Sequence, residues 1–136
     1  MFVTFAEDGE QIRLANETDD YILGIVSSHP SALSNNRAHE WQGKYLTNAF
    51  GDRILDEDGN PIINPKYDET VKYIPRADRA EWAQIGLMGQ LVMCDDGTCQ
   101  VGKYCSSGRN GIATAAATGW RVMKRIDKNH IKVLFK

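Results

Sequence analysis

The chain has 136 residues, of which 42% are hydrophobic and 25% charged, and its formal net charge is −2 at pH 7. A chain of this length can bury its own core, so we predict one domain over residues 1–136. The small negative charge argues against a protein that grips nucleic acid or an anionic membrane, because such proteins usually carry a basic surplus. No apolar run approaches the roughly 20 residues of a membrane span, and the N-terminus lacks a secretory signal pattern. We therefore expect neither nucleic acid nor a membrane as a partner.

The N-terminal quarter predicts three strands. Residues 2–5 and 11–15 flank a turn at residues 7–9 and indicate a small hairpin, because the second stretch alternates polar and apolar residues. Residues 21–26 are continuously apolar, which favours a strand buried on both faces. Gly24 in the middle of this run indicates a bulge or a close crossing of two backbones.

A second hairpin is predicted where residues 53–55 and 61–63 flank the polar segment 56–60. It forms an arm that reaches into solvent, and residues 64–79 follow it as an extended connector. Apolar residues on such an arm need a partner surface, at about 25 cal/mol per Å² of buried area. That surface belongs either to a neighbouring copy or to the arm's own domain. The interface residues expected on the arm and connector are Ile54, Leu55, Ile62, Ile63, Tyr73 and Trp82.

The C-terminal third centres on residues 85–105, where apolar runs flank the sequence DDGT. We predict a hairpin that turns at residues 95–98, with residues 98–101 as its second strand. Residues 111–118 are weakly helical at best, and residues 120–126 and 131–135 predict two final strands. The whole pattern predicts an all-β fold, a short-stranded sandwich or barrel-like domain with long loops and an extended hairpin arm.

Three cysteines, Cys94, Cys99 and Cys105, lie close together in the sequence. Their spacing differs from the CxxC pairs of zinc sites, and the three histidines are remote in sequence. Free thiols in a reducing compartment are the expected state, while one disulfide or a metal site stays open as an alternative. We predict that the cysteines are not zinc ligands.

Acidic pairs occur at Asp19 with Asp20, Asp56 with Asp58, and Asp95 with Asp96. Paired carboxylates can perform acid–base chemistry, but each of these pairs sits in a predicted turn, which explains it without a catalytic role. The sequence contains neither a phosphate-binding glycine loop nor a G-x-S-x-G nucleophile elbow. No cofactor and no metal is therefore expected.

Seven ordered stretches with uncommon residue combinations cover nearly the whole chain. They are DDYILGIVS at 19–27, EWQGKYLTNAFG at 40–51, NPKYD at 64–68, YIPRADRAEW at 73–82, GLMGQLVMCDDGTCQVGKYC at 86–105, GIAT at 111–114 and WRVMKRI at 120–126. Together they resemble the peptidase G2 family, the self-cleaving intramolecular chaperone domain found at the C-terminus of bacteriophage tail-spike and pre-neck appendage proteins.

The resemblance implies a domain that helps an upstream spike or fibre of the same polypeptide to trimerise and then separates by cleavage at its own N-terminal edge. The family's cleavage chemistry is implied to belong to a segment like Asp-Tyr-Ala-Glu, just upstream of the stretch that corresponds to Phe2-Val3-Thr4. No such segment precedes Phe2, and the similar residues 5–8 fall in the first hairpin turn. We therefore carry over no catalytic residue and expect a piece of a longer protein or a free-standing relative that lacks the scissile segment.

Three functions follow as hypotheses. The first is a homotrimeric assembly module of a phage or prophage spike, active in the host cytoplasm during assembly and then released as a fragment or kept as a virion tail component. The second is a self-cleaving enzyme that uses carboxylates of this chain, with Asp19 and Asp20 as candidates. The third is a plain structural or binding β-domain of a virion.

Overall fold

A computed structural model describes residues 1–30, 32–34 and 38–136 of the chain, without the side chains of residues 38–40. The chain divides into two compact units, which we take separately: unit 1 comprises residues 1–31 and 83–136, and unit 2 comprises residues 32–82. Antiparallel strands dominate and confirm the predicted all-β class. The helical pieces of the described chain are three short 3₁₀ turns, η1 (Ala38–Gly43), η2 (Arg76–Asp78) and η3 (Arg109–Gly111). None of the described helices is long and apolar enough to cross a membrane.

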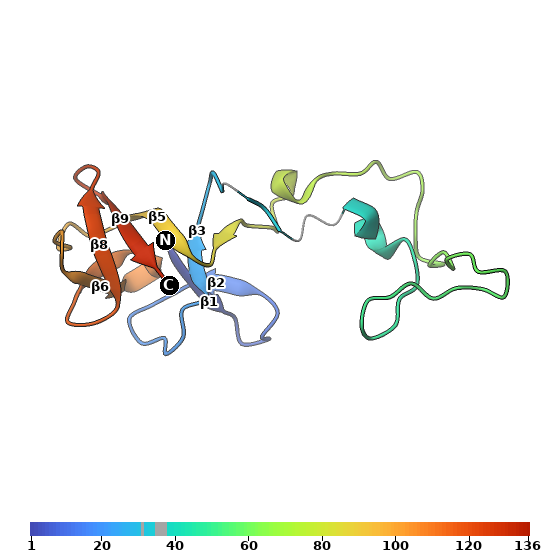
Figure 1. Ribbon diagram of the computed structural model, residues 1–136, viewed down its shortest axis with the longest axis horizontal. Helices are drawn as coiled ribbons and strands as arrows, with labels where there is room; N and C mark the ends of the chain where they lie inside the picture. Colours follow the sequence, from blue (N-terminus) through green and yellow to red (C-terminus); the bar gives the residue numbers. More distant parts are fainter. Residues whose placement is uncertain (31, 35–37) are drawn as a thin grey trace. The chain divides into compact units, whose positions relative to one another are not determined.

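The first sheet of unit 1 contains the predicted N-terminal hairpin (Figure 1). Its strands are β1 (Phe2–Phe5), β2 (Ile12–Leu14), β3 (Gly24–Val26) and β4 (Ile85–Gly86), in the order β2-β1-β3-β4 with every neighbour antiparallel. The amide of Ala6 donates to the carbonyl of Gln11 at 2.8 Å and closes the hairpin turn. The strand predicted over residues 21–26 is shorter than expected, because it begins at Gly24.

The second sheet of unit 1 has five antiparallel strands in the order β5-β9-β8-β6-β7. They are β5 (Gly89–Cys94), β6 (Tyr104–Ser107), β7 (Ala113–Ala116), β8 (Trp120–Arg125) and β9 (His130–Phe135). The last two confirm the predicted C-terminal strands. Alternate residues of β9 are buried, namely Ile131, Val133 and Phe135.

Two sequence predictions are wrong in this sheet. The central hairpin does not form, because β5 pairs with β9 along its whole length and residues 98–101 contain no strand. The chain does turn after Asp95, but the apolar alternation of β9 provides a better neighbour for β5 than the polar residues after the turn. The stretch predicted as weakly helical contains strand β7 instead, because its pairing with β6 overrides the helix propensity of alanine.

The two sheets pack on each other through aromatic side chains. The ring of Phe2 lies 4.7 Å from that of Trp120 and 6.4 Å from that of Phe135, centroid to centroid. Trp120 and Phe135 are stacked at 5.0 Å. Burial of these and neighbouring apolar side chains is the main stabilising term of unit 1. The buried cluster comprises Phe2, Ala15, Ile25, Met93, Cys99, Cys105, Ala113, Val122, Ile131, Val133 and Phe135.

Close backbone contacts require glycine at two places in unit 1. At Gly24 an added Cβ would lie 2.5 Å from Cγ2 of Ile85 and 2.7 Å from the carbonyl oxygen of Gly86, which confirms the predicted close crossing. Gly111 has a φ of +70°, and a Cβ there would collide with the backbone of Phe2. The amide of Gly111 also donates to the carbonyl of Ala15, so η3 is tied to the first sheet.

Unit 2 is built on an eight-residue repeat that closes on itself. Three central residues, Leu46, Ile54 and Ile62, form a ring of backbone hydrogen bonds. Leu46 donates to Ile62 at 3.0 Å, Ile54 to Leu46 at 2.9 Å and Ile62 to Ile54 at 3.0 Å. Around this ring the chain makes isolated antiparallel bridges between Thr47 and Arg53, Leu55 and Pro61, and Tyr45 and Ile63. The second of these bridges closes the predicted hairpin arm.

The turns between the repeats share one local structure. Asn48, Asp56 and Asn64 each accept backbone amides on their side-chain oxygen, as turn-forming Asx residues do. Glycines with positive φ recur every eight residues, at Gly43, Gly51 and Gly59. Despite this regular backbone, none of the described side chains of unit 2 is fully buried. The described part of the unit therefore has an ordered hydrogen-bond pattern but no hydrophobic core of its own.

The packing at η3 predicts a large cost for Gly111→Ala. The added Cβ meets backbone atoms that cannot move away, and the residue would also need a left-handed conformation. We expect a loss of about 2–4 kcal/mol in the free energy of unfolding, measured by urea denaturation. Gly9→Ala is the matched control, because Gly9 has a φ of +72° with no atom within 4 Å of the added Cβ. The control should lose only about 1 kcal/mol, and equal losses in both variants would contradict the proposed collision.

Candidate functional site: the Asp95–Arg125 network and the N-terminal edge

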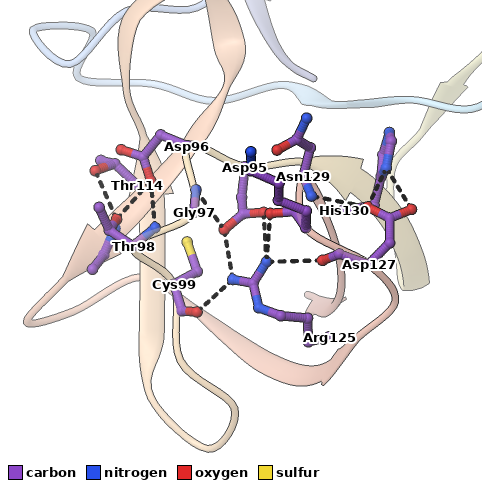
Figure 2. Close-up of polar contacts among 12 residues, drawn as sticks. Asp95, Asp96, Gly97, Thr98, Cys99, Thr114, Arg125, Asp127, Asn129 and His130 are labelled. Atoms are coloured by element: carbon purple, nitrogen blue, oxygen red, sulfur yellow. Dashed lines mark hydrogen bonds and ion pairs between the residues drawn. The ribbon is translucent and has the colours of Figure 1, made fainter.

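The most extensive polar network of unit 1 forms where β5 ends. The side chain of Asp95 is fully buried, and it accepts two hydrogen bonds from the guanidinium of Arg125, at 3.1 Å and 2.8 Å. The amide of Gly97 donates to the same carboxylate at 3.1 Å. Figure 2 shows the resulting fork, in which both carboxylate oxygens face the guanidinium. Such bidentate pairs fix geometry as well as charge.

Arg125 also contacts three backbone carbonyls. It donates to Cys99 at 2.6 Å, to Asp127 at 3.1 Å and to Lys128 at 3.2 Å. The guanidinium thereby joins the end of β5, the loop that follows it and the turn between β8 and β9. Sequence reasoning did not identify Arg125 as the partner of Asp95, because its strand position depends on a register shift between Val122 and Lys124 in β8.

A second, exposed cluster extends this network on the side of β7. The carboxylate of Asp96 accepts hydrogen bonds from the amide and the hydroxyl of Thr98, at 2.9 Å and 2.6 Å. The Thr98 hydroxyl in turn lies 3.5 Å from that of Thr114 and accepts the amide of Ala115 at 2.9 Å. These bonds anchor the loop after β5 to strand β7, as Figure 2 shows.

The electrostatics of Asp95 favour a structural role. Burial alone raises the pKa of its carboxyl, but the hydrogen bonds and charge of Arg125 outweigh burial and hold the pKa below the usual value. A carboxylate that stays ionised and fully hydrogen-bonded is a poor proton donor at neutral pH. One carboxylate oxygen each of Asp95 and Asp96 and the Sγ atom of Cys99 also lie within 4.8 Å of one another, a spacing that could hold a metal ion. Arg125 already supplies positive charge to that cluster.

The three cysteines are free thiols in the structure. Cys99 and Cys105 are buried, and burial is the main cause that raises their pKa values to about 12 and about 11. The thiol of Cys105 donates to the carbonyl of Trp120 at 3.5 Å. Such buried thiols with raised pKa values are poor nucleophiles.

The two carboxylates predicted as cleavage candidates lie in the loop after β2. Asp19 forms a bidentate pair with Arg13 at 2.7 Å and 2.8 Å and accepts the amide of Asn16 at 2.7 Å. The hydrogen bond from Arg13 is the main cause that lowers the pKa of Asp19 to about 2. Asp20 is exposed beside it. The geometry gives Asp19 a loop-closing role, and a catalytic role for either residue stays a prediction.

The N-terminal edge of the chain, residues 1–5, includes a central strand of the first sheet. β1 lies between β2 and β3, and its first residue, Phe2, is completely buried. The carbonyl of Met1 accepts the amide of Val26 at 3.0 Å. Burial lowers the pKa of the Met1 amino group, whereas the neighbouring Cys94 acts in the opposite direction. The backbone at this edge is thus held by the sheet.

The residues predicted as an interface all lie in unit 2. Leu55, Ile63 and Trp82 expose 53%, 57% and 44% of their surface, although they are large and apolar. Ile54 is 41% exposed, whereas Ile62 and Tyr73 are half-buried. Trp82 also lies under the guanidinium of Arg76, 3.9 Å from its ring centroid. The structure therefore presents these residues at the surface of the unit.

A protein-family model matches residues 1–132 of this chain, and its description reads "Peptidase_G2, IMC autoproteolytic cleavage domain". The chain belongs to the Peptidase_G2 family. This match covers both units and confirms the resemblance carried by the seven sequence stretches.

Relatives of this Peptidase_G2 chain include phage proteins. A putative phage-related protein, YobO of Bacillus subtilis (strain 168), is 40% identical over 128 residues. The pre-neck appendage protein of Bacillus phage B103 is 36% identical over 120 residues. These alignments cover 85% and 82% of this chain but only 16% and 14% of the two relatives. The chain thus spans a small part of the length of the curated relatives that it matches.

The fold of this Peptidase_G2 chain also matches solved structures. The C-terminal fragment of bacteriophage phi29 gene product 12 superimposes with a TM-score of 0.77 at 30% sequence identity, over 99% of this chain and 89% of that fragment. The pre-mature form of the same phage protein gives a TM-score of 0.80 at 30% identity and covers 99% of this chain but 19% of that one.

The buried ion pair predicts a clear effect of Asp95→Asn. The variant leaves the Arg125 charge without its carboxylate, and removal of one partner of a buried pair typically costs 3–5 kcal/mol. Because the Arg125 side chain keeps 32% exposure, we expect a smaller loss of about 2–4 kcal/mol in the free energy of unfolding. Asp127→Asn is the control, since Asp127 pairs with His130 at the surface, and it should lose much less. A similar loss in both variants would contradict the special role of Asp95.

The same pair predicts a pH dependence of stability. The folded pKa of Asp95 is lowered, so its contribution is present above the unfolded value of 3.8 and is lost as the pH falls toward the folded pKa. The difference in unfolding free energy between the natural chain and Asp95→Asn should be constant above about pH 5 and shrink below it. Urea titrations over this range measure the difference, and a difference that grows on acidification would refute the assignment.

The three cysteines should differ in how fast their thiols are chemically modified. With a thiol-modifying reagent near pH 8, Cys94, which is only half-buried, should react first. Cys99 and Cys105 should react only after unfolding, because their pKa values are about 12 and about 11 and both are buried. Peptide mass spectrometry of partially modified protein measures this order. Equal rates at Cys94 and Cys99 in the folded protein would show that Cys99 is accessible.

Proposed function

We propose that this chain is the C-terminal assembly module of a phage or prophage appendage protein, a homotrimeric intramolecular chaperone that helps the upstream part of its polypeptide to assemble. It belongs to a family whose description includes autoproteolytic cleavage. Its relatives include pre-neck appendage proteins of Bacillus phages. Assembly in the host cytoplasm, followed by release of the module or its retention in the virion, is the setting that this function requires.

The observation that carries the proposal is the missing core of unit 2. Its backbone is regular, with the closed ring through Leu46, Ile54 and Ile62, yet no described side chain of the unit is fully buried. A segment of about 50 residues whose described side chains form no core has little apolar burial to stabilise it on its own. Exposed apolar residues such as Leu55 and Ile63 supply the surface that a partner would cover.

A second copy of the chain is the simplest partner for this surface. In a cyclic assembly each copy covers the exposed surface of the next copy, and the ring closes. Such an assembly does not lead to open-ended polymers. Three copies match the three-chain spike that the family resemblance implies. In such a trimer the module brings three chains into register before the upstream part folds, which lowers the entropic cost of their later pairing.

The trimer predicts a specific effect of Trp82→Ala. Trp82 exposes 44% of its surface in unit 2, so its removal should weaken association if the unit forms the interface. Sedimentation equilibrium at micromolar concentration should give a trimer mass for the natural chain and a shift toward monomer for the variant. Tyr21→Ala, which removes a 53% exposed aromatic side chain from unit 1, should leave the trimer intact. A monomer mass for the natural chain would refute the trimer.

We expect this chain to remain uncleaved by itself. Residues 1–136 contain no Asp-Tyr-Ala-Glu segment, and the pKa of Asp19 is lowered to about 2 by Arg13, which makes it a weak base. Intact mass measured over days at neutral pH should stay constant. A specific internal cut would contradict this expectation, and its loss in Asp20→Asn but not in Glu17→Gln would assign the chemistry to Asp20.

A further inference from the structure

We propose that the outer face of the five-stranded sheet binds the acidic β1–β2 hairpin of a neighbouring copy. This inference rests on the proposed trimer and names the two surfaces of unit 1 that meet in it. The basic face is defined here by Arg121, Lys124 and Lys132, and the acidic hairpin by Glu7, Asp8 and Glu10.

The strand register places the basic residues on one side of the sheet. Val122 lies opposite Val133, and both are buried against the core. The residues between the buried ones therefore face outward: Lys124 lies directly opposite Lys132, and Arg121 opposite Leu134. The labelled strands β5, β9 and β8 carry this face side by side in Figure 1.

The basic face has the properties of an unpartnered surface. Two lysines directly opposite each other on neighbouring strands repel, which destabilises a sheet unless something negative lies over them. Within the described part of the chain, no ion pair is formed by Lys124, Lys132 or Arg121. Apolar side chains lie beside the charges, with Val92 50% and Tyr104 40% exposed. A face with both features is typical of a protein contact.

Charge within unit 1 is strongly divided between its two segments. Residues 1–31 contain six carboxylates and one arginine, a net charge of −5. Residues 83–136 contain eight lysines and arginines and three aspartates, a net charge of +5. The described ion pairs of unit 1 lie within one segment or the other: Arg13 with Asp19, Arg125 with Asp95, and His130 with Asp127. None of these described ion pairs joins the two segments.

The acidic hairpin of one copy cannot contact the basic face of the same copy. The inner side of the five-stranded sheet packs on Phe2 of β1, through Trp120 and Phe135. The basic face is the opposite side of the same sheet, so it looks away from the sheet that contains the hairpin. In a cyclic trimer each contact joins two different patches of the chain. Complementary charge on two distant patches of one unit is what such a contact requires.

The hairpin is built to present its carboxylates. Asp8 accepts the amides of Glu10 and Gln11 at 3.0 Å and 2.9 Å, which holds the turn in shape. Glu7 and Glu10 are exposed at that turn. The turn therefore carries two exposed acidic side chains, matched in number to the facing pair Lys124 and Lys132.

Charge reversal tests the contact. Sedimentation velocity of the full chain at micromolar concentration should show a weaker trimer for Lys124→Glu/Lys132→Glu and for Glu7→Lys/Glu10→Lys, each by about tenfold or more in the dissociation constant. The variant with all four changes restores opposite charges and should recover the trimer. For the natural chain, association should weaken between about 0.05 M and about 0.5 M NaCl.

The control is Glu17→Lys/Asp20→Lys, which makes the same charge change as the hairpin reversal at exposed residues of the loop after β2 and should leave association unchanged. Circular dichroism and thermal melting establish that each variant folds. If the natural chain is a trimer and both reversals leave it intact, this contact is wrong while the proposed trimer stands. If all three double variants weaken association equally, net charge rather than this contact is responsible and the inference fails. If the natural chain is a monomer, the proposed trimer fails, and this inference with it.

Discussion

The buried pair between Asp95 and Arg125 is the contact on which the loop structure of unit 1 depends. The stretch between β5 and β6 contains no strand, and its backbone bonds to strands lie near its two ends, from Asp96 to Ala113 and from Gly102 to Val122. Arg125 adds contacts across the stretch by binding the carboxylate of Asp95 and the carbonyls of Cys99, Asp127 and Lys128. Transfer of two charges out of water is costly, so the net contribution of the pair to stability is smaller than its direct attraction suggests. Its larger effect is to select one arrangement of these loops.

The two units are stabilised by different means. Unit 1 packs two sheets through Phe2, Trp120 and Phe135 and has a continuous buried cluster. Unit 2 repeats a turn with glycine at one corner and Asn or Asp at another, and closes three such turns by backbone hydrogen bonds. Backbone bonds exposed to water contribute little net stability. The second unit is therefore the part of the chain whose order depends most on a partner.

Two features of the chain favour association: apolar side chains that stay exposed in unit 2, and like charges that face each other on the five-stranded sheet. An arm that exposes Leu55 and Ile63, and a sheet with Lys124 opposite Lys132, are unfavourable in an isolated chain. Both become favourable where another surface covers them. The chain belongs to the Peptidase_G2 family, and its fold matches a fragment of bacteriophage phi29 gene product 12. The carboxylates of Asp19 and Asp95, in contrast, are engaged in ion pairs within the chain.

Local patterns in the sequence predicted much of this fold. The alternation of Ile131, Val133 and Phe135 was sufficient for the last strand, and turn residues located the first hairpin and the polar tip of the arm. The eight-residue repeat of unit 2 was not predicted, although glycine recurs at 43, 51 and 59, because this period is shorter than that of solenoid repeats. Motif order identified the family. These features depend on neighbours in sequence, which a sequence displays directly.

Tertiary structure alone decided the partner of β5 and the buried ion pair. The turn after Asp95 suits a hairpin, but the competing strand β9 lies more than 30 residues away, and no local pattern reveals such pairing. In a regular strand β8, Lys124 would face the core on the same side as Val122, and Arg125 would face outward. A register shift between Val122 and Lys124 reverses this order, so that Arg125 lies opposite the buried Ile131 and can reach Asp95. One extra residue in one strand thus determines which charge is buried and which charges remain on the outer face.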